Sequence, residues 1–190
     1  MRHYVGKENR FIDIIDNPFG TAFHEKLYHY VTGSYFRIGS QDGPSPLDRR
    51  NHVYIHSDYS IDDINRIGFL DKLKDLPEFE AYKDLPLIRT TINVSVPSDT
   101  NFAHTHDNQI ALVYYINLDW KHEWAGETVF YNEDMSEIDF SSIYKPARLV
   151  IFDGEIPHSI RVQSNSAPHY RFTLAMFFDN SGVINKIDDK

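Results

Sequence analysis

The chain has 190 residues, of which 41% are hydrophobic and 14% aromatic, and it contains no cysteine. This length and composition predict one globular domain with a sizeable core, and 12 tyrosines with 13 phenylalanines favour β-structure. A formal net charge of -9 argues against a nucleic-acid partner, and the lack of cysteine excludes disulfides and thiolate metal ligands. The sequence shows no apolar signal segment and no apolar run of membrane-spanning length. We therefore expect a cytoplasmic protein without a membrane partner.

Helices are predicted in the N-terminal half of the chain. An apolar stripe at i, i+4 spacing predicts one helix that begins near Thr21 and ends at Gly33. A second helix is expected to begin after Ser60, because Asp63 stands where a capping acid belongs, and to end before Pro77.

Short β-runs divided by turns follow, with no helix-length segment between them. This pattern favours a β-sandwich or jelly roll over a parallel α/β sheet, with the earlier helices packed on the outside of one sheet. We expect a single domain, 1–190, in which 1–86 is mostly helical support and 87–180 is a jelly-roll core. The expected strands are 87–96, 110–118, 128–131, 148–152, 159–162 and 170–178.

A metal site is predicted from three histidines. His104 and His106 directly precede a strand, and in an extended chain they point to the same side, whereas Asp107 starts on the other side. A third histidine, His158, follows a later strand, and Arg171 opens the last strand. Imidazole nitrogens suit iron, zinc, copper or nickel, so the ligand type alone does not name the metal. The set predicts a metal ion with an anion-binding arginine beside it.

Seven motifs follow one another in order within residues 88–179: His104-Thr105-His106, Tyr114-Tyr115-Ile116-Asn117, Trp120, Gly126-Glu127-Thr128, Pro146-Ala147-Arg148-Leu149-Val150-Ile151-Phe152, Pro157-His158 and Arg171-Phe172-Thr173. In this order they resemble the Fe(II)- and 2-oxoglutarate-dependent dioxygenases, especially the prolyl-hydroxylase-like branch. That resemblance implies a double-stranded β-helix, the jelly roll of cupin-like proteins, with Fe(II), 2-oxoglutarate and O2 as cofactor and cosubstrates.

The resemblance also implies roles for single residues. His104 and His158 would be iron-binding histidines. Arg171 would pair with the far carboxylate of 2-oxoglutarate, because a guanidinium is a planar two-pronged donor that stays charged when buried. The Tyr115 hydroxyl would donate to the same carboxylate, and Thr173, two residues beyond Arg171 on the same strand face, would add another contact.

The chain departs from the family at the carboxylate ligand. His106 occupies that position, and Asp107 comes one residue late. Two site models follow. In the first, His104, His106 and His158 form a three-histidine site, which leaves the iron centre one charge unit more positive. In the second, a kink turns Asp107 inward as the acidic ligand and His106 supports it from outside the coordination shell.

Three functions are compatible with these observations. The first is a 2-oxoglutarate-dependent oxygenase that hydroxylates a small-molecule or peptide substrate and releases succinate and CO2. The second is a cupin-type three-histidine dioxygenase that does not use 2-oxoglutarate, and the third is a non-enzymatic metal-binding jelly roll. In the first case, the loops at 39–51 and 120–124 are expected to line the entrance to the site.

Overall fold

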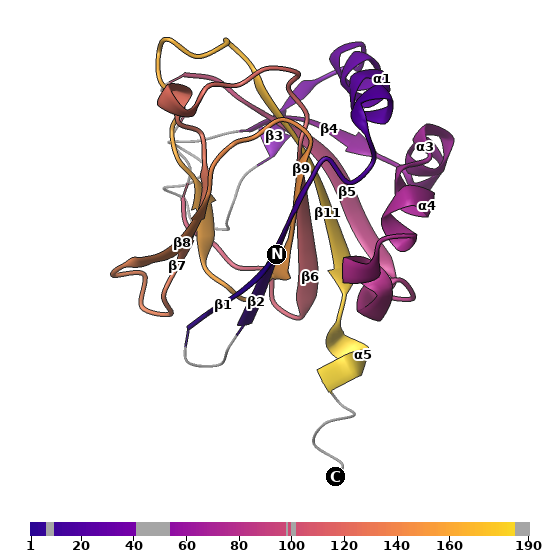
Figure 1. Cartoon of the computed structure of the whole chain (residues 1–190), viewed down its shortest axis with the longest axis vertical. Coiled ribbons are helices and arrows are strands. Elements are labelled where there is room, and N and C mark those ends of the chain that lie inside the picture. The colour runs from indigo at the N-terminus through magenta and orange to yellow at the C-terminus, as the bar shows by residue number, and fades with distance from the viewer. Residues whose placement is uncertain (7–9, 41–53, 98, 100–101, 185–190) are drawn as a thin grey trace.

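Two antiparallel sheets face each other in the computed structural model, which describes residues 1–6, 10–40, 54–97, 99 and 102–184 (Figure 1). Eight strands form the larger sheet, in the spatial order β1 (Arg2–Val5), β2 (Arg10–Asp16), β9 (Arg148–Asp153), β6 (Gln109–Tyr115), β11 (Arg171–Asp179), β5 (Leu87–Ser95), β4 (Tyr54–Tyr59) and β3 (Arg37–Ser40). Three strands form the smaller sheet, in the order β10 (His158–Ile160), β7 (Thr128–Tyr131) and β8 (Ile138–Ser142).

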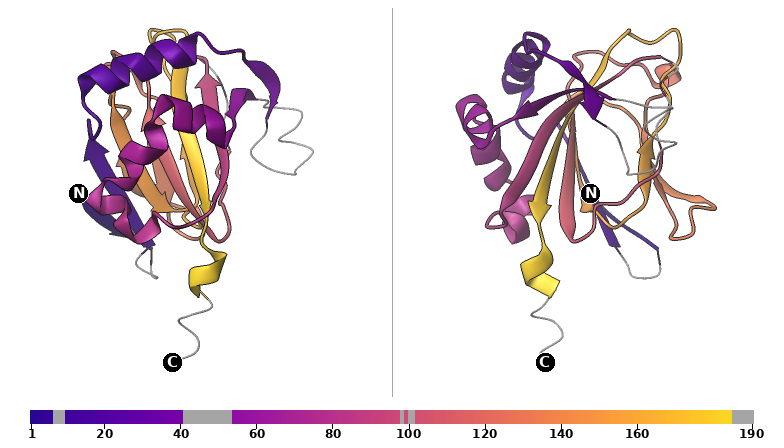
Figure 2. Two further views of the ribbon diagram at one scale, coloured as in Figure 1. Left: turned by 90° about the vertical axis from the view of Figure 1, so that its right-hand side faces the viewer. Right: turned by 180° about the vertical axis from the view of Figure 1, so that it is seen from behind.

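Helices cover the outer face of the larger sheet, on the side away from the smaller sheet (Figure 2). They are α1 (Thr21–Thr32), α3 (Ile61–Ile67) and α4 (Phe69–Lys74). Two short 3-10 helices, η1 (Pro77–Tyr82) and η2 (His122–Trp124), and a last turn of helix, α5 (Ser181–Ile184), complete the described elements. Within the described part of the chain, no helix is both long and apolar enough to cross a membrane.

The alternation of side chains along β11 divides the core into two layers. Leu174 and Met176 point outward and pack with the helices, whereas Ala175 and Phe177 point inward and pack with residues of the smaller sheet. A strand covered on both faces reads as an almost continuous apolar run, which is the pattern of this segment. The inner face of the larger sheet is therefore the wall on which a site between the sheets is built.

The structure confirms a mainly β fold with flanking helices and the jelly-roll arrangement of two antiparallel sheets. All six predicted strands are present, and the helix predicted from Thr21 is present with Gly33 at its C-terminus. Ser60 and Asp63 form the predicted capping box. The segment before Pro77 is two helices rather than one, because Gly68 adopts the left-handed conformation with φ of 78°.

Five strands of the described residues were not among the six expected: β1, β2, β3, β4 and β8. Aspartate is uncommon in strands, and Asp13 of β2 is also buried, with only 2% of its side chain exposed. Arg2 of β1 compensates that carboxylate with an ion pair of 2.6 Å. Residues 1–86 therefore supply both the covering helices and strands of the larger sheet, whereas mostly helical support had been expected.

Candidate metal centre

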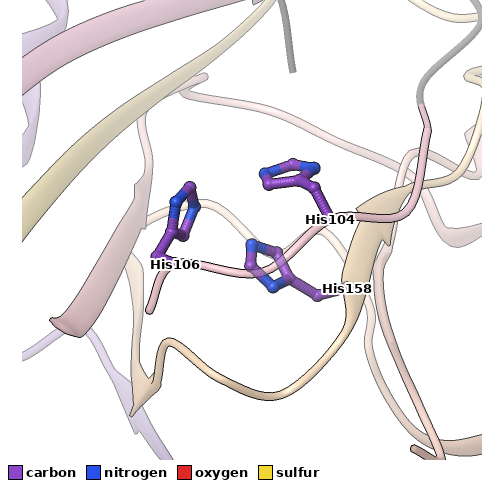
Figure 3. Close-up of side chains that lie close together, drawn as sticks. All are labelled: His104, His106 and His158. Carbon is purple, nitrogen blue, oxygen red and sulfur yellow. The ribbon is translucent and has the colours of Figure 1, made fainter. Parts of the chain in front are cut away.

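His104, His106 and His158 are brought together by backbone pairing between two distant segments. The amide of His104 donates to the carbonyl of His158 at 3.1 Å, and the amide of His158 donates back to the carbonyl of His104 at 3.0 Å. The three residues each offer one ring nitrogen, and these nitrogens lie within 4.8 Å of one another. Figure 3 shows the three rings gathered above the two segments that carry them. This is the group of histidines that the sequence predicted.

Gly154 fixes the position of the His106 segment. The amide of His106 donates to the carbonyl of Gly154 at 2.7 Å, and the amide of Gly154 donates to the carbonyl of Gln109 at 2.8 Å. A Cβ at position 154 would lie 2.6 Å from the His106 carbonyl oxygen and 2.7 Å from that of Gln109, closer than real Cβ contacts. A glycine is therefore needed for the turn after β9 to approach His106 so closely.

Local hydrogen bonds set the tautomer of two of the rings. Nδ1 of His104 lies 3.0 Å from the carbonyl oxygen of Phe102, and Nδ1 of His158 lies 2.8 Å from that of Ile156. A carbonyl oxygen only accepts, so each Nδ1 carries the proton. In a neutral ring Nε2 then carries the lone pair that a metal ion needs, which is a common arrangement for metal-binding histidines.

The surroundings favour neutral imidazoles. Burial, and then the nearby rings of His104 and His106, hold the pKa of His158 well below its usual value. Burial is also the first cause for His106, whose pKa is lowered to about 3 with smaller contributions from His104 and Arg89. Metal binding to these two rings therefore requires no proton to be removed near neutral pH.

Asp107 lies outside this group. It is exposed, and its carboxylate accepts a hydrogen bond from the Thr105 hydroxyl at 3.4 Å. No carboxylate joins the three histidines among the described residues that could share a metal ion. The geometry thus matches the three-histidine alternative, and a ligand role for Asp107 would need the chain at this point to rearrange.

The three histidines open into a cavity of about 190 Å³ between the two sheets. Its wall on the larger sheet is formed by inward residues of β5, β6 and β11, and its other wall by residues of β7 and β10. Thr173 lines this cavity, as do Thr128 and Phe177. Trp120 and Trp124 are not among its lining residues, and that the 120–124 loop lines the entrance stays a prediction. Residues 41–51 of the other predicted entrance loop lie outside the described part of the chain.

Arg171 and Thr173 lie on the same face of β11, because Thr173 follows Arg171 by two residues. Arg171 is buried, with 1% of its surface exposed. Its Nε donates to the carbonyl of Gly126 at 2.9 Å. Its guanidinium carbon lies 4.6 Å from the centre of the Tyr144 ring and 5.6 Å from that of Tyr115. Arg171 does not itself line the cavity, whose wall at this end includes Thr173 and Thr128.

The Tyr115 hydroxyl is directed at neighbouring protein groups. It lies 2.9 Å from the Thr128 hydroxyl oxygen and 3.3 Å from the Ser142 carbonyl oxygen. Of the three residues predicted to hold an anion, Thr173 lines the cavity, while Arg171 and Tyr115 lie buried together behind this wall. The structure thus groups them at one end of the metal centre.

Sequence reasoning missed two residues of this site. Tyr144 packs against Arg171, and its hydroxyl lies 2.6 Å from the carbonyl oxygen of Phe172, where β11 begins. Arg89, on β5, lines the cavity with the three histidines. A signal for Arg89 was present, because alternate residues of β5 from Arg89 to Ser95 are all polar and the intervening ones are mostly apolar.

No protein-family model matches the chain, and no curated protein sequence matches it. Solved structures do. A prolyl hydroxylase from Trichoplax adhaerens, in complex with a peptide fragment of the hypoxia inducible factor oxygen degradation domain, is similar with TM-score 0.60 and 14% identity over 90% of this chain and 84% of that one. A 2OG-Fe(II) oxygenase family oxidoreductase from Burkholderia pseudomallei gives TM-score 0.61 and 11% identity over 89% and 85%.

HygX from Streptomyces hygroscopicus, with nickel and 2-oxoglutarate bound, gives TM-score 0.60 and 9% identity over 90% of this chain and 83% of that one. The chain therefore has the fold of the 2-oxoglutarate- and Fe(II)-dependent oxygenases, among them the prolyl hydroxylases. The resemblance inferred from the sequence motifs is confirmed at the level of the fold.

Proposed function

We propose that this protein is an Fe(II)- and 2-oxoglutarate-dependent oxygenase that hydroxylates a small-molecule or peptide substrate. One observation carries the proposal. Three imidazoles meet in a cavity on the inner wall of a jelly roll, and a buried arginine opens the strand that crosses that wall. Similar structures include an enzyme with nickel and 2-oxoglutarate bound and an enzyme in complex with a peptide.

The donor set fits iron(II). His104, His106 and His158 would hold the ion through neutral imidazole nitrogens, which are suitable ligands for it. Iron(II) together with 2-oxoglutarate supplies the activation of O2: one oxygen atom enters a C–H bond of the substrate, and the other enters succinate as CO2 is released. Because the protein contributes no ligand charge, the centre would be more positive than one with a carboxylate, and this favours binding of anions.

Arg171 would receive the far carboxylate of 2-oxoglutarate. Its guanidinium stays charged when buried and offers two parallel donors to a carboxylate. Gly126 holds Nε, and the aromatic rings of Tyr144 and Tyr115 hold the guanidinium plane, so the side chain is oriented before any ligand arrives. Thr173 would add its hydroxyl from the cavity wall, and the Tyr115 hydroxyl would turn from Thr128 to the ligand.

Succinate formation tests the proposal. The purified protein should convert 2-oxoglutarate to succinate only when Fe(II) and O2 are supplied, slowly alone and faster with a substrate. Arg171→Ala should reduce this conversion at least about 100-fold at low 2-oxoglutarate, because a charge-assisted pair is lost, whereas Arg66→Ala on α3 should not change it. Undiminished conversion by Arg171→Ala would refute the proposed role.

A shortened cosubstrate separates lost recognition from misfolding. 2-Oxopentanoate lacks the second carboxylate, so any decarboxylation of it should be equally slow in the native protein and in Arg171→Ala. Loss of activity on both compounds, together with a lowered melting temperature, would indicate a folding defect instead. Arg171→Lys, which keeps the charge, should recover part of the activity on 2-oxoglutarate.

The three-histidine ligand set also supports a second candidate, a dioxygenase that does not use 2-oxoglutarate. Such an enzyme would consume O2 with an organic substrate at the same rate in the presence and absence of 2-oxoglutarate. Fe(II) binding without any O2 consumption, in either condition, would instead favour a non-enzymatic metal-binding jelly roll.

A further inference from the structure

A second arginine faces the three histidines from the opposite side of the site. Arg89 lies on β5 and lines the same cavity as His104, His106 and His158. It stands directly opposite Phe177 in the pairing of β5 with β11, whereas Arg171 stands opposite Ser95. Six residues of β11 separate these two positions, which is about 20 Å along a strand. The two arginines therefore mark opposite ends of the inner wall.

Aromatic packing positions the Arg89 guanidinium next to the metal centre. Its central carbon lies 4.3 Å from the centre of the Phe177 ring. The Phe177 ring in turn lies 4.5 Å from the His106 ring, edge to face. One aromatic ring thus separates the guanidinium from a candidate metal ligand.

The surroundings of Arg89 differ from those of Arg171. Arg171 is enclosed in the protein, whereas Arg89 is exposed to solvent on the cavity side. Its neighbours on the cavity wall include Thr91 and Asn93, which are neutral hydrogen-bonding residues. The formal net charge of the whole chain is -9, so a cation at this position creates a local attraction for a small anion against the overall negative charge.

We propose that Arg89 binds the primary substrate and that this substrate carries a carboxylate beside the carbon to be oxidised. This inference rests on the proposed function and extends it, because it names the chemical class of the substrate. A guanidinium fork matches a carboxylate with two parallel hydrogen bonds, and Thr91 and Asn93 would bind polar groups next to it. Arg171 holds the cosubstrate at one end, and Arg89 selects the substrate at the other.

Carboxylate binding can be measured without knowing the substrate. The protein is loaded with Mn(II) and 2-oxoglutarate, and the paramagnetic relaxation of 13C-labelled acetate is followed by NMR. The native protein and Arg66→Gln should show saturable relaxation, whereas Arg89→Gln, which changes the net charge equally, should require at least about tenfold more acetate, equivalent to about 1.4 kcal/mol. Equal titrations for the native protein and Arg89→Gln would overturn the proposal.

Inorganic phosphate, followed by 31P relaxation, forms a second arm of this experiment. Weaker binding of phosphate than acetate is expected. Tighter binding of phosphate, lost in Arg89→Gln, would overturn the assignment of a carboxylate in favour of a phosphate.

Turnover then separates this proposal from the general function. The 20 amino acids and their C-terminal amides are compared as stimulants of succinate formation. The best stimulant is expected to be an acid, its amide should be at least about tenfold weaker, and Arg89→Gln should lose this difference. An acid and its amide that differ as much in Arg89→Gln as in the native protein would overturn the substrate role, and a raised KM for 2-oxoglutarate in Arg89→Gln would place Arg89 in the cosubstrate site instead. Absence of succinate formation in the native protein would refute the oxygenase function, while the acetate titration still decides the role of Arg89.

Discussion

His104 and His158 show how single residues prepare this cavity for a metal ion. In both, Nδ1 donates to the carbonyl of the residue two positions earlier, Phe102 or Ile156. The same local geometry thus occurs twice, on two segments that the fold brings together. Such hydrogen bonds fix the orientation of a ring, so less entropy is lost when a metal ion binds.

Substitution of the neighbouring candidate ligands distinguishes the two site models. His106→Ala should lower the affinity for Fe(II) by more than the 10- to 100-fold typical of groups that only support a ligand, because an imidazole within the group of three is removed. Asp107→Ala should bind Fe(II) as the native protein does, because Asp107 is exposed and lies outside that group. The measurement is bound iron after anaerobic loading and gel filtration. A loss of iron in Asp107→Ala with retention in His106→Ala would establish the opposite model.

At the scale of elements, the turn before β7 supports the strand that carries Arg171. Gly126 has φ of 81°, and a Cβ there would lie 3.2 Å from Cδ and Nε of Arg171 and 3.3 Å from Cζ2 of Trp120. Trp120 is itself held by a hydrogen bond from its ring nitrogen to the carbonyl of Ala125 at 2.9 Å. The loop of residues 120–126 therefore packs against the Arg171 side chain.

Gly126→Ala is predicted to impair 2-oxoglutarate binding at least about tenfold, because the methyl group displaces the Arg171 side chain. It should also destabilise the fold by about 1–2 kcal/mol from backbone strain. Gly20→Ala is the matched control, since Gly20 has φ of 79° with nothing within 4 Å of the added Cβ. Binding measured by isothermal titration should be unchanged in Gly20→Ala. Equal losses of binding in both variants would show that strain, and not the contact with Arg171, is responsible.

His24 joins α1 to the larger sheet through two hydrogen bonds. Its Nε2 donates to the carbonyl of Asn117 at 3.1 Å, and its Nδ1 accepts from the Tyr114 hydroxyl at 3.1 Å. Burial is the main cause that lowers the pKa of His24. The folded protein therefore keeps this ring neutral at a pH where the unfolded chain, with a histidine pKa of about 6.5, already binds a proton.

This difference predicts a loss of stability in mild acid. As the pH falls from 7.5 to 5.5, the free energy of unfolding should decrease by up to about 1.4 kcal/mol more in the native protein than in His24→Gln. The loss is confined to the range between the unfolded pKa and the lower folded pKa, because outside it both states bind the same number of protons. Urea denaturation at the two pH values measures it. Parallel losses in the two proteins would show that His24 is not the group responsible.

At the scale of the whole molecule, the sequence predicted the elements that have one dominant periodicity. The apolar strands and the stripe of α1 are such elements. The strands outside its six expected ones are β1, β2, β3, β4 and β8, which are short or rich in charged and polar residues. Asp13 of β2 is an example, since only the pairing of β1 with β2 brings Arg2 to its carboxylate. Such strands depend on tertiary partners, which a local pattern does not contain.

The candidate site was predictable in the same uneven way. The spacing of His104 and His106 and the position of His158 after a strand were enough to group them. The surroundings of Arg171 were not predicted, because Gly126 and Tyr144 reach it only through the packing of the two sheets. Arg89 lay in a predicted strand, but its place beside the metal centre follows from the register between β5 and β11, which sequence alone does not fix.

A crystal structure of the protein loaded anaerobically with Fe(II) and 2-oxoglutarate tests the central claim most directly. We predict an anomalous iron peak bound by Nε2 of His104 and His158 and by a ring nitrogen of His106, with the far carboxylate of 2-oxoglutarate on the Arg171 guanidinium. An iron ion bound by Asp107 with His106 turned away, or a cosubstrate that reaches Arg89 instead of Arg171, would contradict it.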